Sequence, residues 1–171
     1  PHALALLYQS RVVTQIYEGL VNRGKDFKLE PSLATSWEMV NPTTWRFKLR
    51  AGVKFHDGSP LTSEDVKASY DRIISPPAGV VSIRKAYYED LIVETPDPAT
   101  VLIKLKNPMA GGMEALASPF NCIYSAAKLK ENPRFPETTI LGTGAFQFVE
   151  HVRGSYWVAK RFDQYFKKDL P

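Results

Sequence analysis

Residues 43–66 have the sequence TTWRFKLRAGVKFHDGSPLTSEDV, which combines an alternating segment, a turn and the start of a helix. The large apolar side chains Trp45, Phe47 and Leu49 alternate with basic ones, a pattern typical of a strand with one buried face. We interpret the basic residues between them as a solvated face rather than an anion site. In FHDGSP, residues 55–60, a glycine follows an aspartate, which indicates a tight turn.

A long helix is predicted directly after this turn. Thr62 is the expected N-cap residue, and Asp65 supplies an acidic side chain three positions later. The Pro76-Pro77 pair should end the helix, because proline does not continue helical geometry. The apolar stripe expected on this helix consists of Val66, Tyr70, Ile73 and Ile74.

The amino-terminal segment SRVVTQIYEGLV, residues 10–21, predicts another helix. Its apolar pairs recur every four residues, which indicates a buried face, and Ser10 is placed to cap the start.

The second half of the chain predicts further strands and short helices. Residues 100–106, TVLIKLK, alternate like a strand, and residues 145–162 predict two strands joined through Arg153-Gly154. Short helices are expected within residues 109–117 and 125–132. The result is one α+β domain over residues 1–171, with a mixed, mostly antiparallel sheet and packed helices.

Composition excludes several classes of protein. The formal net charge is +4, and the basic residues are scattered along the chain, whereas a nucleic-acid surface usually clusters them. No apolar stretch approaches the roughly 20 residues needed to span a bilayer. Cys122 is the only cysteine, so no intrachain disulfide is possible.

The strongest hint of catalysis is His56-Asp57, which is interpreted as part of the turn. Adjacent side chains in an extended or turning segment tend to point apart, and catalytic triads are assembled from distant parts of a chain. The histidines show no metal-ligand spacing, so neither a metal nor a cofactor is expected. GTG, residues 142–144, lacks the lysine of a phosphate loop and is interpreted as a strand entry that lets another backbone approach closely.

Several separated motifs resemble the extracellular solute-binding proteins of the family that serves peptide and nickel ABC importers. They are YEGLV (17–21), LEPSLATSWE (29–38), the stretch 43–66 and GTGAFQFVEHVRGSYWVAKRFDQYF (142–166). The resemblance covers nearly all of this chain but only an early part of the family's length. It implies an amino-terminal fragment, part of the first lobe of a two-lobed periplasmic-binding-protein fold with the second lobe absent.

The resemblance also implies a function. A protein of this kind captures a small solute, here most consistent with a peptide, and delivers it to an ABC transporter permease. It is expected to be a monomer that binds no nucleic acid, located in the periplasm or anchored at the surface of a bacterial cell. The stretch FHDGSPLTSEDV then becomes scaffold.

Four residues are expected to contact ligand by similarity to relatives. Arg84 and Tyr87 match the spacing of an arginine and an aromatic residue in nickel-binding members. An arginine pairs with anionic groups, and a tyrosine offers a ring and a hydroxyl. Ser118 and Asn121 stand where nickel binders carry arginine, which favours a peptide ligand over a nickel chelate. The alternative is that Arg84 is an exposed loop residue and Tyr87 is core packing.

Two other functions remain open at this point. One is an enzyme, hydrolase-like, with a site near His56 and Asp57; an alanine at His56 would separate this from a scaffold role. The other is a surface that mediates contacts with the transporter.

Overall fold

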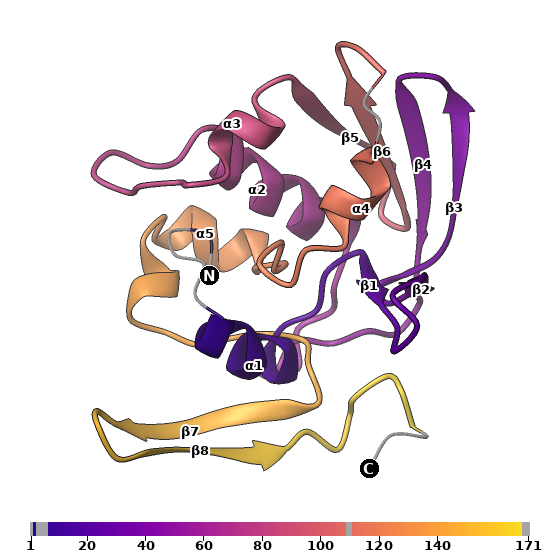
Figure 1. Ribbon diagram of the computed structural model, residues 1–171. Helices are drawn as coiled ribbons and strands as arrows, with labels where there is room; N and C mark the ends of the chain where they lie inside the picture. Colours follow the sequence, from indigo (N-terminus) through magenta and orange to yellow (C-terminus); the bar gives the residue numbers. More distant parts are fainter. Residues whose placement is uncertain (1, 3–6, 109–110, 169–171) are drawn as a thin grey trace.

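The centre of the protein is a four-stranded sheet in a computed structural model that describes residues 2, 7–108 and 111–168. Its strands are β3 (Ala34–Asn41), β4 (Thr44–Leu49), β5 (Leu91–Asp97) and β6 (Thr100–Leu105), in the order β3-β4-β6-β5. All neighbouring strands in it are antiparallel (Figure 1). The structure therefore confirms the α+β class with a mostly antiparallel sheet.

The helix predicted after the turn is α2 (Ser63–Ile74), and it covers one face of this sheet (Figure 1). The Thr62 backbone N–H donates to the Asp65 carboxylate at 2.7 Å, so the predicted cap is confirmed. On the facing side of the sheet, Phe47 is fully buried and Leu49 nearly so, while Trp45 is only half-buried. The period-two pattern thus identified the buried face of β4.

The prediction for the amino-terminal helix was wrong at both of its ends. α1 spans Leu7–Ile16, so Ser10 lies inside it, and Val21 opens the short strand β1 (Val21–Arg23), which pairs with β2 (Leu29–Pro31). The apolar spacing continues beyond Ile16 because the chain passes from a buried helix face straight into a buried turn and strand. Spacing alone does not distinguish these two kinds of burial.

The remaining elements are short. They are α3 (Lys85–Tyr88), α4 (Gly112–Leu116), α5 (Ala126–Glu131), the 3-10 helix η1 (Phe135–Glu137), β7 (Phe146–Val152) and β8 (Tyr156–Arg161). The predicted hairpin is confirmed: β7 pairs with β8, and Gly154 takes a φ of 77° in its turn. The hairpin lies under α1, apart from the four-stranded sheet (Figure 1). Residues 109–110 of a predicted helix lie outside the described residues.

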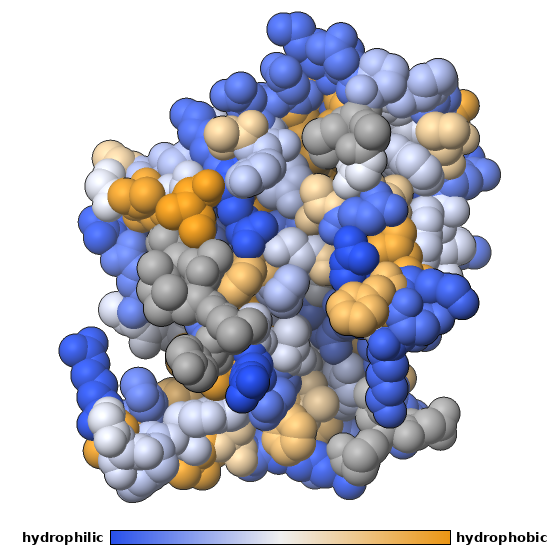
Figure 2. All heavy atoms as spheres, viewed as in Figure 1, coloured by the Kyte–Doolittle hydropathy of each residue, from blue (hydrophilic) through white to orange (hydrophobic). Residues whose placement is uncertain are grey.

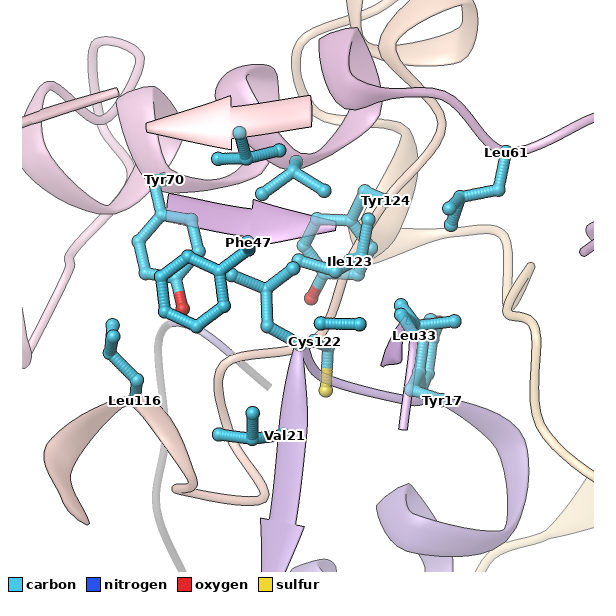
Figure 3. Close-up of a cluster of buried hydrophobic side chains, with 14 of the residues drawn as sticks. Tyr17, Val21, Leu33, Phe47, Leu61, Tyr70, Leu116, Cys122, Ile123 and Tyr124 are labelled. Atoms are coloured by element: carbon cyan, nitrogen blue, oxygen red, sulfur yellow. The ribbon is translucent and has the colours of Figure 1, made fainter. Parts of the chain in front are cut away.

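The core is built around residues 122–124, which run between α1 and α2 (Figure 3). Cys122, Ile123 and Tyr124 are all buried there, in one cluster with Phe47 and Tyr70. Burial raises the pKa of the Cys122 thiol to about 12, which keeps it protonated and unreactive near neutral pH.

The segment after β8 is joined to the segment between α1 and β1 through hydrogen bonds to the Glu18 carboxylate. Tyr165 Oη donates to Glu18 Oε1 at 2.5 Å, and Ser32 Oγ donates to Glu18 Oε2 at 2.5 Å. These bonds join three segments that are distant in sequence.

Within the described ranges, no helix has the length and apolar character needed to cross a membrane.

Candidate functional site

His56 and Asp57 do not form an acid–base pair in the structure. The exposed Asp57 carboxylate accepts hydrogen bonds from Ser59 N at 3.0 Å and Ser59 Oγ at 2.6 Å, and Gly58 takes a φ of 86°. An aspartate that bonds to the backbone two residues later is typical of a turn. The interpretation of this motif as a turn is confirmed.

The His56 ring is buried and holds the loop that contains GTG. Its Nε2 lies 3.0 Å from the Gly144 carbonyl oxygen, which can only accept, so Nε2 carries the proton. Its Nδ1 then accepts from Gly142 N at 3.4 Å, and the ring meets the edge of Phe162 at a centroid distance of 4.9 Å. Burial lowers the pKa of His56, which favours this neutral ring. The geometry of His56 is that of a structural residue.

Replacing His56 with alanine is expected to destabilise the protein by about 2 kcal/mol, because two buried hydrogen bonds and a ring contact are lost. Urea unfolding measures this change. The control His151→Ala, on the exposed part of β7, should cost less than about 0.5 kcal/mol. A variant as stable as the wild type would contradict the scaffold role.

Arg84 lies at the start of α3 and packs on an aromatic ring from another segment. Its Cζ is 4.8 Å from the centroid of Phe120, a cation–π distance. Its Nε is buried without a hydrogen-bond partner among the described residues. The side chain is half-buried, so Arg84 is not the freely exposed loop residue of the alternative interpretation.

Asn121, which follows Phe120 in the chain, lies in a hydrogen-bond cluster centred on Tyr88. Its Nδ2 donates to Tyr88 Oη at 2.8 Å and to the Ala115 carbonyl at 2.9 Å, and Tyr88 Oη donates to the same carbonyl at 2.8 Å. Asn121 is only 1% exposed, and its Oδ1 finds no partner in the described part of the chain. Burial raises the pKa of Tyr88, although Asn121 and the Arg84 charge oppose the shift. This buried amide fixes the loop after α4.

Tyr87 and Ser118 occupy the edges of this region. Tyr87 is 71% exposed and lines a depression of about 240 Å³ with Leu91 and Leu105, so it is not core packing. Ser118 is half-buried in the turn that ends at Asn121, whose backbone N donates to the Ser118 carbonyl at 3.0 Å. A second hollow of about 300 Å³ lies beside this turn, lined by Thr14, Tyr17, Gly19, Asn22, Arg23, Ala117 and Pro119.

These positions form an open surface around α3 and the loop after α4. The structure brings Arg84, Asn121 and the turn of Ser118 together, whereas Tyr87 lies in a separate depression. Among the residues that the structure describes, no three His, Cys, Asp or Glu side chains are grouped to hold a metal ion. The chemistry available here is a guanidinium on an aromatic ring, backed by a buried amide.

Comparison with known families decides what kind of protein carries this surface. The model of bacterial extracellular solute-binding proteins, family 5 Middle, matches residues 28–171. The chain belongs to this family. The resemblance drawn from the sequence motifs is therefore confirmed.

Individual members of family 5 show the same relationship. The chain is 32% identical over 161 residues to the glutathione-binding protein GsiB of Escherichia coli K12, covering 94% of this chain and 31% of GsiB. It is 38% identical to AgaA of A. tumefaciens R10, whose structure holds agropinic acid, with a TM-score of 0.86 over 93% of this chain and 32% of AgaA. It is 27% identical to AppA of Bacillus subtilis, whose structure holds a nonapeptide, with a TM-score of 0.86 over 96% of this chain and 34% of AppA.

The chain spans about a third of the length of the family 5 relatives that it matches. These relatives bind different small solutes with the same scaffold, so the family does not specify the ligand.

Two residues at the centre of the site were missed by sequence reasoning, Tyr88 and Phe120. Tyr88 stands four positions after Arg84, a spacing that places side chains on the same side of a helical turn, and this signal was available. No local signal marks Phe120, because its contact with Arg84 depends on how the loop after α4 folds back over α3.

Proposed function

We propose that residues 1–171 are part of the first lobe of a larger bacterial solute-binding component of an ABC importer. The whole protein captures a small solute, a peptide, between two lobes outside the cytoplasm and delivers it to the permease. The observation that carries the proposal is the match of the family 5 model to residues 28–171. The protein acts as a monomer and is periplasmic or anchored at the cell surface.

The open surface around α3 supports a role in ligand contact. A single lobe presents its half of a cleft to solvent, and the Tyr87 side chain, 71% exposed, offers a ring and a hydroxyl at such a surface. Arg84 is held over Phe120, and within the described residues its Nε is unsatisfied and its guanidinium makes no ion pair with a carboxylate. Charge-assisted contacts of arginine with carboxylates are often bidentate, and they suit the terminal carboxylate or an acidic side chain of a peptide.

The four candidate residues contribute in different ways in this proposal. Arg84 and Tyr87 contact the ligand directly, through charge and through ring and hydroxyl. Ser118 contributes its hydroxyl at the edge of the same surface. Asn121 contacts the ligand only through Oδ1, which has no partner among the described residues, because its Nδ2 is fully used by Tyr88 and by backbone carbonyls.

The first experiment is mass spectrometry of solutes released from the natively purified full-length protein. We expect co-purifying peptides, because closure of two lobes over a ligand buries most of its surface. The absence of any bound solute, together with no response to peptides in a thermal-shift panel, would argue against the transport role.

The variant Arg84→Met tests the site within that protein. We expect peptide affinity measured by calorimetry to fall by about tenfold or more, since a charge-assisted hydrogen bond is lost while apolar volume is kept. The matched control is Arg46→Met, an exposed β4 arginine that pairs with Glu38 at 3.0 Å on the sheet. Equal affinity in Arg84→Met and Arg46→Met would remove Arg84 from the ligand site.

A further inference from the structure

Arg72 is a buried arginine, and two of its guanidinium nitrogens have no hydrogen-bond partner among the described residues. It lies on α2 near the helix end, with only 8% of its surface exposed. Its Nε and Nη1 are shielded from solvent, and neither makes a hydrogen bond in the part of the chain that the structure describes. Buried guanidinium groups are normally paired, because removing a charge from water is costly unless an opposite charge or acceptors replace the solvent.

Arg72 is among the lining residues of two cavities. One, of about 310 Å³, lies between the end of α2, the loop after it and the 3-10 helix η1. The other, of about 340 Å³, lies between α2 and α5 and is also lined by Arg72. The residues that line the first cavity are His2, Arg72, Gly79, Val80, Val81, Tyr124, Arg134, Pro136 and Glu137. None of Arg84, Tyr87, Ser118 or Asn121 is among them.

The acidic groups of these cavities are already engaged elsewhere. Glu137 accepts a two-pronged contact from Arg134, with distances of 3.0 and 2.8 Å, and it is solvent-exposed. That ion pair, more than the charge of Arg72, lowers the pKa of Glu137. Asp71 in the second cavity pairs with Lys67 at 2.8 Å. The first cavity is therefore lined by two arginines, Arg72 and Arg134, and by one carboxylate, Glu137, which already pairs with Arg134.

His2 adds an unpaired acceptor to the same cavity. Its Nε2 lies 3.0 Å from the Cys122 carbonyl oxygen and must donate to it, so Nδ1 bears a lone pair. Nδ1 is buried without a partner among the described residues, and the ring packs on Tyr124 at a centroid distance of 4.5 Å. An occupant pairs with Arg72 through anionic oxygens, and one that also carries an O–H group can donate a hydrogen bond to His2 Nδ1.

We propose that the cavity lined by Arg72 and His2 binds a small oxyanion, a phosphate or carboxylate group. The fork of the Arg72 guanidinium matches two oxygens of such a group. Hydrogen phosphate also carries an O–H group that can donate a hydrogen bond to His2 Nδ1. The side chains of Val80 and Val81 border the opening, on the loop between α2 and α3, where Figure 2 shows exposed apolar surface at the left edge. This site is independent of the ligand contact proposed for Arg84.

Isothermal titration of the purified protein with inorganic phosphate at constant ionic strength tests this site. We expect one phosphate per molecule in the wild type. In Arg72→Met the affinity should fall by about tenfold or more, because a bidentate charge-assisted contact is lost. The control Arg46→Met removes an exposed arginine and should bind phosphate like the wild type. Competition by acetate distinguishes a general oxyanion site from one restricted to phosphate, and either result supports the proposal.

A crystal of the wild-type protein soaked in selenate gives a readout that does not depend on how the Arg72 variant folds. Selenium anomalous signal within contact distance of the Arg72 guanidinium is the expected result. The proposal is overturned by wild-type protein that binds no phosphate, by Arg72→Met that binds it as tightly as the wild type, or by selenate found only at other positions.

Discussion

Replacing Gly142 with alanine is expected to destabilise the folded protein by more than about 3 kcal/mol, at the upper end of the cost of overpacking. A Cβ at this position would lie 2.0 Å from the Ile16 carbonyl oxygen and 2.8 Å from the Ile16 carbonyl carbon. Both are backbone atoms at the end of α1, so no side chain can rotate to make room. The loop also cannot shift freely, because the Gly142 carbonyl accepts from His56 N at 2.9 Å.

Gly24→Ala is the matched control for this prediction. Its added Cβ would lie 2.1 Å from Glu30 Oε1, an equally short contact, but with the end of a flexible and exposed side chain. We expect a cost below about 1 kcal/mol, since Glu30 can change rotamer. Denaturant unfolding of both variants measures the difference. Similar losses in both would show that the close approach of two backbones at Gly142 is not what makes glycine necessary there.

Acidification from pH 7 to pH 4 is expected to remove about 3 kcal/mol of stability through His2 alone. Burial lowers the pKa of His2 from 6.5 to about 3 in the folded protein. Between these two values the unfolded chain binds a proton at His2 that the folded chain does not. The free energy of unfolding therefore rises with pH in this range and falls on acidification, and the contribution is fully present only above pH 6.5.

The comparison of wild type with His2→Phe measures this contribution. Phenylalanine keeps a ring against Tyr124 but has no group to protonate, so its stability should fall less steeply between pH 6.5 and 4. If the slopes of wild type and His2→Phe coincide, the buried His2 ring does not titrate as the structure requires.

Local patterns in the sequence were sufficient for the central part of the fold. The alternation around Phe47 identified a half-buried strand, and the Thr62 and Asp65 signal located the start of α2. Both depend on interactions within a few residues. The end of α1 was not predictable in this way, because Gly144 N, from a distant loop, bonds to the Ile16 carbonyl at 2.9 Å where the helix stops.

The candidate site was likewise predictable from the sequence only in part. Similarity to the family selected Arg84, Tyr87, Ser118 and Asn121, but their surroundings came from folding. Only the folded chain places Phe120 under Arg84 and surrounds Asn121 with carbonyl groups. The sequence likewise contains no sign that Arg72, one arginine of an amphipathic helix, would be buried with two guanidinium nitrogens unpartnered among the described residues.

By itself the sequence determined the α+β class, the turn at His56-Asp57 and the membership of a solute-binding family, because each is encoded by local spacing or by a series of motifs. The tertiary structure alone decided which polar side chains are buried, which polar atoms have no partner among the described residues and which glycines face another backbone. These properties depend on segments that are distant in the chain, such as Ile16 and Gly142 or His2 and Cys122, and no local pattern records which of them meet.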